Sequence, residues 1–218
     1  MSGRSPQLWN AVDGSIVAPD KWQEKDGRTE VQITLQPNAS LFVVFSKESA
    51  PVAKELFVLA VKPLNIKEWK VTFASTSKVV TRDSLFDWSK DTDPTIKYYS
   101  GHAAYETHFQ WKGKADKVLL QLGRVDNIAT VIVNGVVCGT VWTYPYAIDI
   151  TSALKKGKNE LKIEVVNTWA NAIEGNDEGV PPFKGIWTNA KYRRADKTLL
   201  PAGLLGPLNL EIESSKNK

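Results

Sequence analysis

The feature that most constrains the fold of this 218-residue chain is a two-residue hydrophobic period that recurs in many short segments. EVQITL at 30–35, WKVTF at 69–73 and ELKIEV at 160–165 alternate polar and apolar side chains, as half-buried β-strands do. Further runs of strand length occupy residues 41–45, 105–111, 118–122, 129–133, 136–138 and 208–212. Helix is scarce, with a turn or two expected at TSAL, residues 151–154. This pattern predicts an all-β, antiparallel β-sandwich.

Asn134-Gly135 is the clearest local turn signal in the chain, because it lies between two β-branched runs, 129–133 and 136–138. Asn-Gly favours a type I′ turn, in which both central residues have a positive φ. We therefore predict a two-residue hairpin at this position.

The strand pattern also divides the chain. Residues 1–50 contain a few strands, too few to form a sandwich alone, and we expect them to belong to, or to pack like, a preceding β-domain. Residues 46–52 have the composition of a linker. The second series of strands falls in 51–218, and its rhythm is broken by a glycine- and proline-rich stretch, 170–207, with no strand pattern. A stretch of that length is usually functional or an interface.

The charge pattern argues against a nucleic acid partner, and the lack of a long apolar run argues against a membrane partner. The 28 basic and 24 acidic residues alternate along the chain, and no basic stripe forms. We interpret the one cluster, Lys191, Arg193, Arg194 and Lys197, as a solvated loop in preference to a phosphate-binding patch. No apolar run reaches 18 residues, and the first ten residues contain no apolar signal-peptide region. The chain is thus expected to be soluble without an export signal of its own.

No residue pattern predicts catalysis or a metal site. The sequence contains no G-x-S-x-G and no phosphate-binding glycine motif. His102 and His108 lack zinc-ligand spacing, and the single cysteine, Cys138, is expected to be a small buried side chain. Loop carboxylates are the harder case, because a glycosidase needs two of them; the candidates are Glu174, Asp177, Glu178, Asp87, Asp91 and Asp93. Loop acids are more often solvated or calcium ligands. We predict no catalytic residue, no metal ligand and no cofactor, with a structural calcium ion as the alternative.

Aromatic residues beside polar ones are the best functional signal. The chain has eight tryptophans, and a tryptophan ring offers a flat apolar face on which a sugar can stack. The predicted sugar-binding residues are Trp88, Trp142, Tyr144, Tyr146, Trp169, Asn171 and Trp187. They are expected on connecting loops at one end of the sandwich. The alternative is that Trp142 and Trp169 plug the ends of the sandwich.

Residues 104–169 resemble the sugar-binding jelly roll attached to glycoside hydrolases of the β-galactosidase type. The similar segments are AYETHF, LLQLGRV, IATVIVNG, CGTVW, YPYAIDIT and ALKKGKNELKIEVVNTW. The flanking segments IKYYSG at 96–101, NTWAN at 167–171 and PAGLLGP at 201–207 resemble family 106 glycoside hydrolases, the α-L-rhamnosidases. The opening Leu8-Trp9-Asn10 and the strands up to Phe45 are similar to the region just before the C-terminal jelly roll of that family.

Two positions depart from the family pattern. Ala172 stands where the family has an arginine, so no contact of that arginine can be carried over, and His102 stands where threonine is usual. The resemblance implies a galactose-binding-like jelly roll over 51–218. It also places catalysis in a separate N-terminal barrel, which needs about 250 residues with eight helices.

The resulting hypothesis is a non-catalytic domain of a rhamnosidase-like glycoside hydrolase, which supports the catalytic domain and contacts plant-type polysaccharide or oligosaccharide. The resemblance implies a periplasmic or secreted parent enzyme. The alternatives are a stand-alone carbohydrate-binding module, an enzyme in its own right, and a nucleic-acid-binding protein whose retention on heparin would fall steeply with salt.

Overall fold

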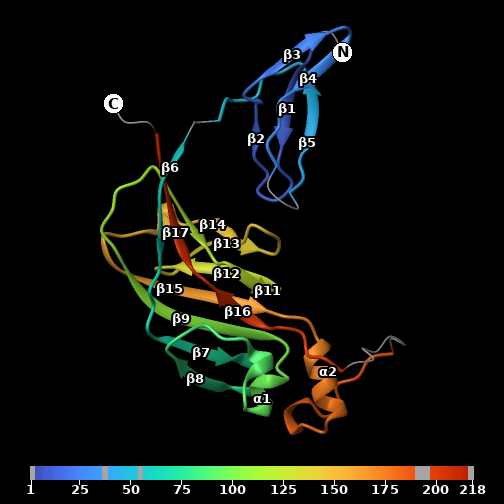
Figure 1. Cartoon of the computed structure of the whole chain (residues 1–218), viewed down its shortest axis with the longest axis vertical. Coiled ribbons are helices and arrows are strands. Elements are labelled where there is room, and N and C mark those ends of the chain that lie inside the picture. Colours follow the sequence, from blue (N-terminus) through green and yellow to red (C-terminus); the bar gives the residue numbers. More distant parts are fainter. Residues whose placement is uncertain (1–2, 36–38, 54–55, 190–196, 216–218) are drawn as a thin grey trace. The chain divides into compact units, whose positions relative to one another are not determined.

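The computed structural model describes residues 3–35, 39–53, 56–189 and 197–215. The chain forms two compact units, residues 1–57 and residues 58–217 (Figure 1). The boundary falls after Phe57. That the first fifty residues belong to a preceding domain stays a prediction.

The first unit is a small antiparallel assembly. Its three-stranded sheet has the order β2–β1–β5, with β1 at Ser5–Trp9, β2 at Ile16–Val17 and β5 at Phe42–Ser46. A separate hairpin joins β3 (Trp22–Lys25) and β4 (Arg28–Val31), and the strand predicted for 30–35 ends at Val31. Among the described residues of this unit, two prolines, Pro6 and Pro19, are buried, but none of its residues belongs to the hydrophobic core cluster.

The second unit contains a six-stranded antiparallel sheet in the order β13–β12–β15–β9–β7–β8. The strands are β7 (Trp69–Phe73), β8 (Lys78–Arg82), β9 (His102–Trp111), β12 (Ile128–Val133), β13 (Val136–Val141) and β15 (Gly157–Val166). A four-stranded sheet follows the order β14–β10–β17–β6, with β6 at Phe57–Pro63, β10 at Lys117–Gln121, β14 at Ala147–Asp149 and β17 at Asn209–Ser214. A third, two-stranded sheet pairs β11 (Arg124–Asp126) with β16 (Gly203–Gly206).

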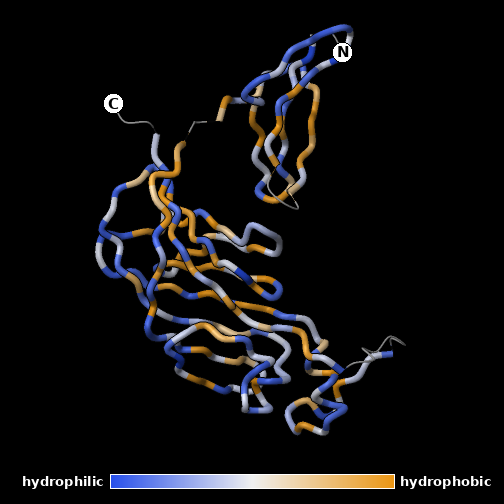
Figure 2. The backbone as a smooth tube through the Cα atoms, viewed as in Figure 1, coloured by the Kyte–Doolittle hydropathy of each residue, from blue (hydrophilic) through white to orange (hydrophobic). Residues whose placement is uncertain are grey.

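The hydrophobic core of the second unit follows from strand alternation. On β9, the side chains of Tyr105, Phe109 and Trp111 are buried, and those of Glu106, His108 and Gln110 lie on the opposite face. The same alternation runs along β15 and β12. Apolar and polar segments therefore alternate along the tube of Figure 2. The predicted all-β, antiparallel β-sandwich is confirmed.

The predicted hairpin is also confirmed. Asn134 has φ 52° and Gly135 has φ 80°, and Val133 pairs with Val136 across the turn. A residue with a positive φ is strained unless it is glycine or a short polar residue such as asparagine.

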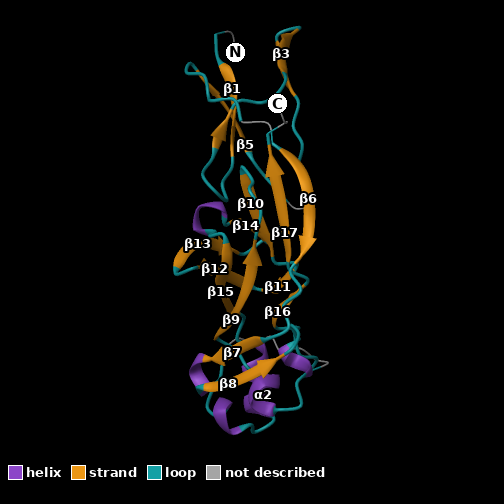
Figure 3. Cartoon of the chain, turned by 90° about the vertical axis from the view of Figure 1, so that its left-hand side faces the viewer, coloured by secondary structure: helices purple, strands orange, loops and turns teal. Residues whose placement is uncertain are grey.

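Helix is more extensive than the sequence indicated. The 3₁₀ turn η3 (Thr151–Ala153) lies where it was expected, but α1 covers Pro94–Lys97 and α2 covers Ala170–Asp177. Three further 3₁₀ turns are η1 (Ala74–Thr76), η2 (Trp88–Lys90) and η4 (Pro181–Phe183). Figure 3 shows most of the helical segments gathered near β7 and β8, with one helical turn apart from them beside β13 and β14. The expectation of no regular structure across 170–207 was wrong, since α2 and β16 both fall there. The sequence ANAIEGND of α2 has weak helix propensity, and contacts with the rest of the unit hold it.

Candidate carbohydrate-contact site

Strand register places the ends of β13 and β15, from which the two aromatic connections start, at one end of the six-stranded sheet. Ala129 on β12 pairs with Val141 of β13 on one side and with Val165 of β15 on the other. β13 and β15 therefore finish at the same end. We call this end, with its connections 142–146 and 167–189, the loop end.

Four of the predicted aromatic side chains at the loop end are open to solvent. The exposed fractions are 52% for Trp142, 50% for Tyr144, 66% for Trp169 and 73% for Trp187. Tyr146 is partly buried and packs against the core. Large apolar side chains at this level of exposure can each present a ring face to a ligand. Trp142 and Trp169 do not plug the sandwich.

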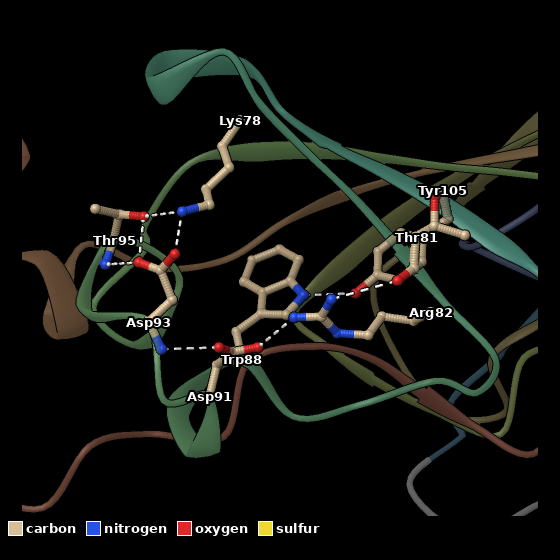
Figure 4. A network of polar contacts seen from close by, with 8 residues as sticks. All are labelled: Lys78, Thr81, Arg82, Trp88, Asp91, Asp93, Thr95 and Tyr105. Carbon is tan, nitrogen blue, oxygen red and sulfur yellow. Dashed lines mark hydrogen bonds and ion pairs between the residues drawn. The ribbon is translucent and has the colours of Figure 1, made fainter.

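Two of the predicted residues are buried, so their side chains offer no surface to a ligand. Trp88 is fully buried, and its indole N–H donates to the hydroxyl of Tyr105 at 2.6 Å (Figure 4). Asn171 is 2% exposed. Its amide donates to the carbonyl of Leu200 and accepts from the N–H of Leu200, both at 2.8 Å. These side chains hold the loops in place, and we leave them out of the candidate site.

Partly buried polar contacts fix the segment that carries Trp169. The Asn167 amide accepts from the N–H of Gly101 at 2.8 Å and donates to the carbonyl of Tyr99 at 2.9 Å. In the first turn of α2, the N–H of Ala172 donates to the Ser100 hydroxyl at 3.0 Å. Trp169 therefore stands on an anchored base, which lowers the entropic cost of binding.

The three aspartates around Trp88 have structural partners. Asp87 accepts from the N–H groups of Ser89 and Ala202, both at 3.0 Å. Asp91 forms an ion pair with Arg82 at 3.0 Å (Figure 4). Asp93 caps α1 and forms an ion pair with Lys78. The hydrogen bond from Lys78, followed by that from Thr95, lowers the pKa of Asp93 from 3.8 to about 2. These carboxylates stabilise the turns that enclose the core.

Comparison with known proteins identifies the family. Residues 84–197 match the model of the glycosyl hydrolase 2 galactose-binding domain-like family, which is more than half of the chain. The chain belongs to this family.

Individual proteins extend the match. A solved rhamnosidase from Novosphingobium sp. PP1Y is 35% identical, with a TM-score of 0.80 over 98% of this chain and 21% of that chain. A Formosa agariphila protein named "Putative beta-glucuronidase" is 34% identical over 68% of this chain and 15% of its own length. The β-D-glucuronidase of Dictyoglomus thermophilum, at 17% identity and a TM-score of 0.51, covers 72% of this chain and 28% of that chain and shares the fold. The chain thus spans about a fifth or less of the two more similar relatives.

Two of the remaining candidate acids have partners or burial of their own within this galactose-binding-like domain. Glu174 lies on the buried side of α2, and Glu178 forms an ion pair with Lys197 at 3.5 Å. A carboxylate pair that the sequence reading missed is Glu211 and Glu213, which share one face of β17. Burial, and then the neighbouring Glu213, raise the pKa of Glu211. Their i, i+2 spacing on a strand is the signal that could have found them.

Two further kinds of reactive group are the Cys138 thiol and the possible metal ligands. Burial raises the pKa of the Cys138 thiol, which disfavours the thiolate. Across the described ranges, His, Cys, Asp and Glu form no cluster of three that could hold a metal ion. Lys191, Arg193 and Arg194 of the predicted basic cluster lie outside the described residues. In the part of the chain that the structure describes, no helix is long and apolar enough to cross a membrane.

Proposed function

We propose that this galactose-binding-like domain is a non-catalytic part of an α-L-rhamnosidase-like glycoside hydrolase, where it supports the catalytic domain and contacts carbohydrate through the loop end. The observation that carries the proposal is the match to the Novosphingobium rhamnosidase. It covers 98% of this chain at 35% identity, but only 21% of that enzyme. The parent would act on plant-type polysaccharide or oligosaccharide in the periplasm or outside the cell, with its catalytic domain N-terminal to this one.

The chemistry of the described carboxylates supports a non-catalytic role. Hydrolysis of a glycosidic bond uses one acid and one base or nucleophile, about 5–10 Å apart around an open site. The aspartates around Trp88 are committed to caps and ion pairs. Exposed tryptophan and tyrosine side chains suit binding of a sugar ring.

An assay of the chain with an aryl α-L-rhamnoside tests the proposal. We expect no release of the aryl alcohol above the uncatalysed rate. Turnover that disappears in Glu174→Gln or Asp177→Asn would show that the chain is an enzyme in its own right.

The exposed aromatic residues favour one second candidate, a stand-alone carbohydrate-binding module. The two candidates differ in affinity. A single stacked ring contributes about 1 kcal/mol beyond area burial, so an accessory contact binds at about millimolar Kd. Binding of a plant polysaccharide at micromolar Kd, without any partner domain, would favour the module.

A further inference from the structure

A groove crosses the outer face of the six-stranded sheet, toward the Asn134–Gly135 end and away from the loop end. Its volume is about 770 Å³. Residues 106–108 of β9 and 160–162 of β15 lie along it, and residues 65–68 and the hairpin turn flank it. No part of the candidate site at the loop end contributes to this groove.

Hydrogen bonds hold both flanks of the groove. On one side, the Thr107 hydroxyl donates to the carbonyl of Glu68 at 2.7 Å. On the other side, the Asn134 amide donates to the carbonyl of Ala153 and to Oδ1 of Asn159, each at 2.8 Å, and accepts from the N–H of Glu160 at 3.0 Å. The groove is therefore preorganised, and a ligand would not have to order it.

The charges along the groove balance. Three lysines and three glutamates line it: Lys67, Lys70, Lys162, Glu68, Glu106 and Glu160. Opposite signs alternate across the strands, because Glu106 pairs in register with Lys70 on one side and with Lys162 on the other. His108 lies opposite Glu160. Extra lysines, Lys155 and Lys158, lie in a smaller hollow of about 270 Å³ beyond Glu160.

This arrangement suits a neutral ligand rich in hydroxyl groups. An anion in the main groove would meet three carboxylates, and a cation would meet three ammonium groups, so neither is favoured overall. Hydroxyl groups both donate and accept, and can use both kinds of side chain. We propose that the groove is a second carbohydrate-binding site, for a neutral oligosaccharide that lies across β9 and β15. The groove shares no residue with the loop end, so an experiment can disprove binding at one site without disproving binding at the other.

The only two histidines of the chain provide built-in reporters. Both are on the outward face of β9, but His108 lines the groove and His102 lies beside Glu164, at 3.6 Å. Six residues of strand separate them, or about 20 Å. The experiment is an NMR titration of the full chain with neutral trisaccharides built on rhamnose, galactose or glucose. We expect at least one of them to shift the His108 ring signals and leave those of His102 in place, equally at low and high salt.

Matched variants assign the contact. His108→Ala and Gln110→Ala remove outward side chains from the same face of β9, and only His108 lines the groove. We expect His108→Ala to weaken binding about five-fold by calorimetry, the loss of one hydrogen bond, and Gln110→Ala to leave it unchanged. Glu160→Ala should weaken it similarly, and Glu160→Gln should restore it, since the amide still accepts a hydrogen bond. The proposal is overturned by a silent His108 with every trisaccharide, by equal losses in the two β9 variants, or by affinity that falls with salt.

Discussion

Tyr105 shows how single residues of the core hold the segments that converge on it. Its buried hydroxyl accepts from the indole N–H of Trp88 at 2.6 Å and from the N–H of Leu204 at 3.1 Å. Burial raises its pKa far above the usual value, so the phenol stays neutral. The backbone also comes close here. A side-chain carbon at Gly203 would lie 2.6 Å from the indole nitrogen of Trp88.

Tyr105→Phe should lower the free energy of unfolding by about 2–4 kcal/mol, because two buried N–H groups lose their acceptor. Urea unfolding followed by tryptophan fluorescence measures the change. Tyr144→Phe is the matched control, since Tyr144 is half exposed and should lose less than about 0.5 kcal/mol. Equal effects in the two variants would contradict the role given to Tyr105.

Asp93 makes the stability of the domain depend on pH. Its pKa is lowered in the fold from 3.8 to about 2 by Lys78 and Thr95. A carboxyl group with a lowered folded-state pKa contributes its full stability above the unfolded pKa, and loses it as pH falls through the folded pKa. We expect Asp93→Asn to cost about 1–2 kcal/mol at neutral pH, after allowance for solvent screening, and only a small fraction of that near pH 2. Acid titrations of unfolding, with the exposed Asp83→Asn as control, would refute this if the difference did not shrink with pH.

At the scale of the element, the β13 hairpin depends on its turn. Gly135 has φ 80°, a region that a β-branched residue resists. Gly135→Val should therefore destabilise the domain by about 1–2 kcal/mol. Thr140→Val places the same side chain within β13 and should cost less. If both variants are as stable as the parent, the positive φ is not required at Gly135.

The sequence predicted those elements whose signal is local. β7 and β12, and the Asn134–Gly135 turn, follow from alternation and turn chemistry within a few residues. α2 could not be predicted in this way, because it depends on distant partners. Asn171 binds the backbone of Leu200, and Ala172 binds Ser100. A side-chain carbon at Gly175 would lie 2.7 Å from Tyr98.

In the candidate site, too, the sequence identified some residues correctly and misjudged others. Trp142, Tyr144, Trp169 and Trp187 are exposed, whereas Trp88 is buried and Asn171 is tied to backbone. Composition and spacing cannot separate these roles, since a tryptophan suits both a core and a sugar platform. The outer face of β9 and β15 was also not foreseen as a site, because the groove depends on side chains that only strand register brings together.

At the scale of the whole molecule, stability resides in the second unit. Every buried aliphatic or aromatic side chain of the described core lies between Trp69 and Ile212. A chain that begins at Leu56, and so retains all of β6, should keep its main thermal transition within a few degrees of the full chain. Calorimetry of the two chains measures this. Loss of cooperative unfolding in the shorter chain would show that residues 1–55 are needed for the core.

The most direct test of the central claim, that this galactose-binding-like domain contacts carbohydrate through the loop end, is a titration of its indole N–H signals with L-rhamnose and rhamnose oligosaccharides. The account predicts saturable shifts of Trp142, Trp169 or Trp187 at about millimolar sugar, while the buried Trp88 stays unchanged as an internal control. If the three exposed indoles remain silent at saturating sugar concentrations, the loop end does not bind carbohydrate and the claim is contradicted.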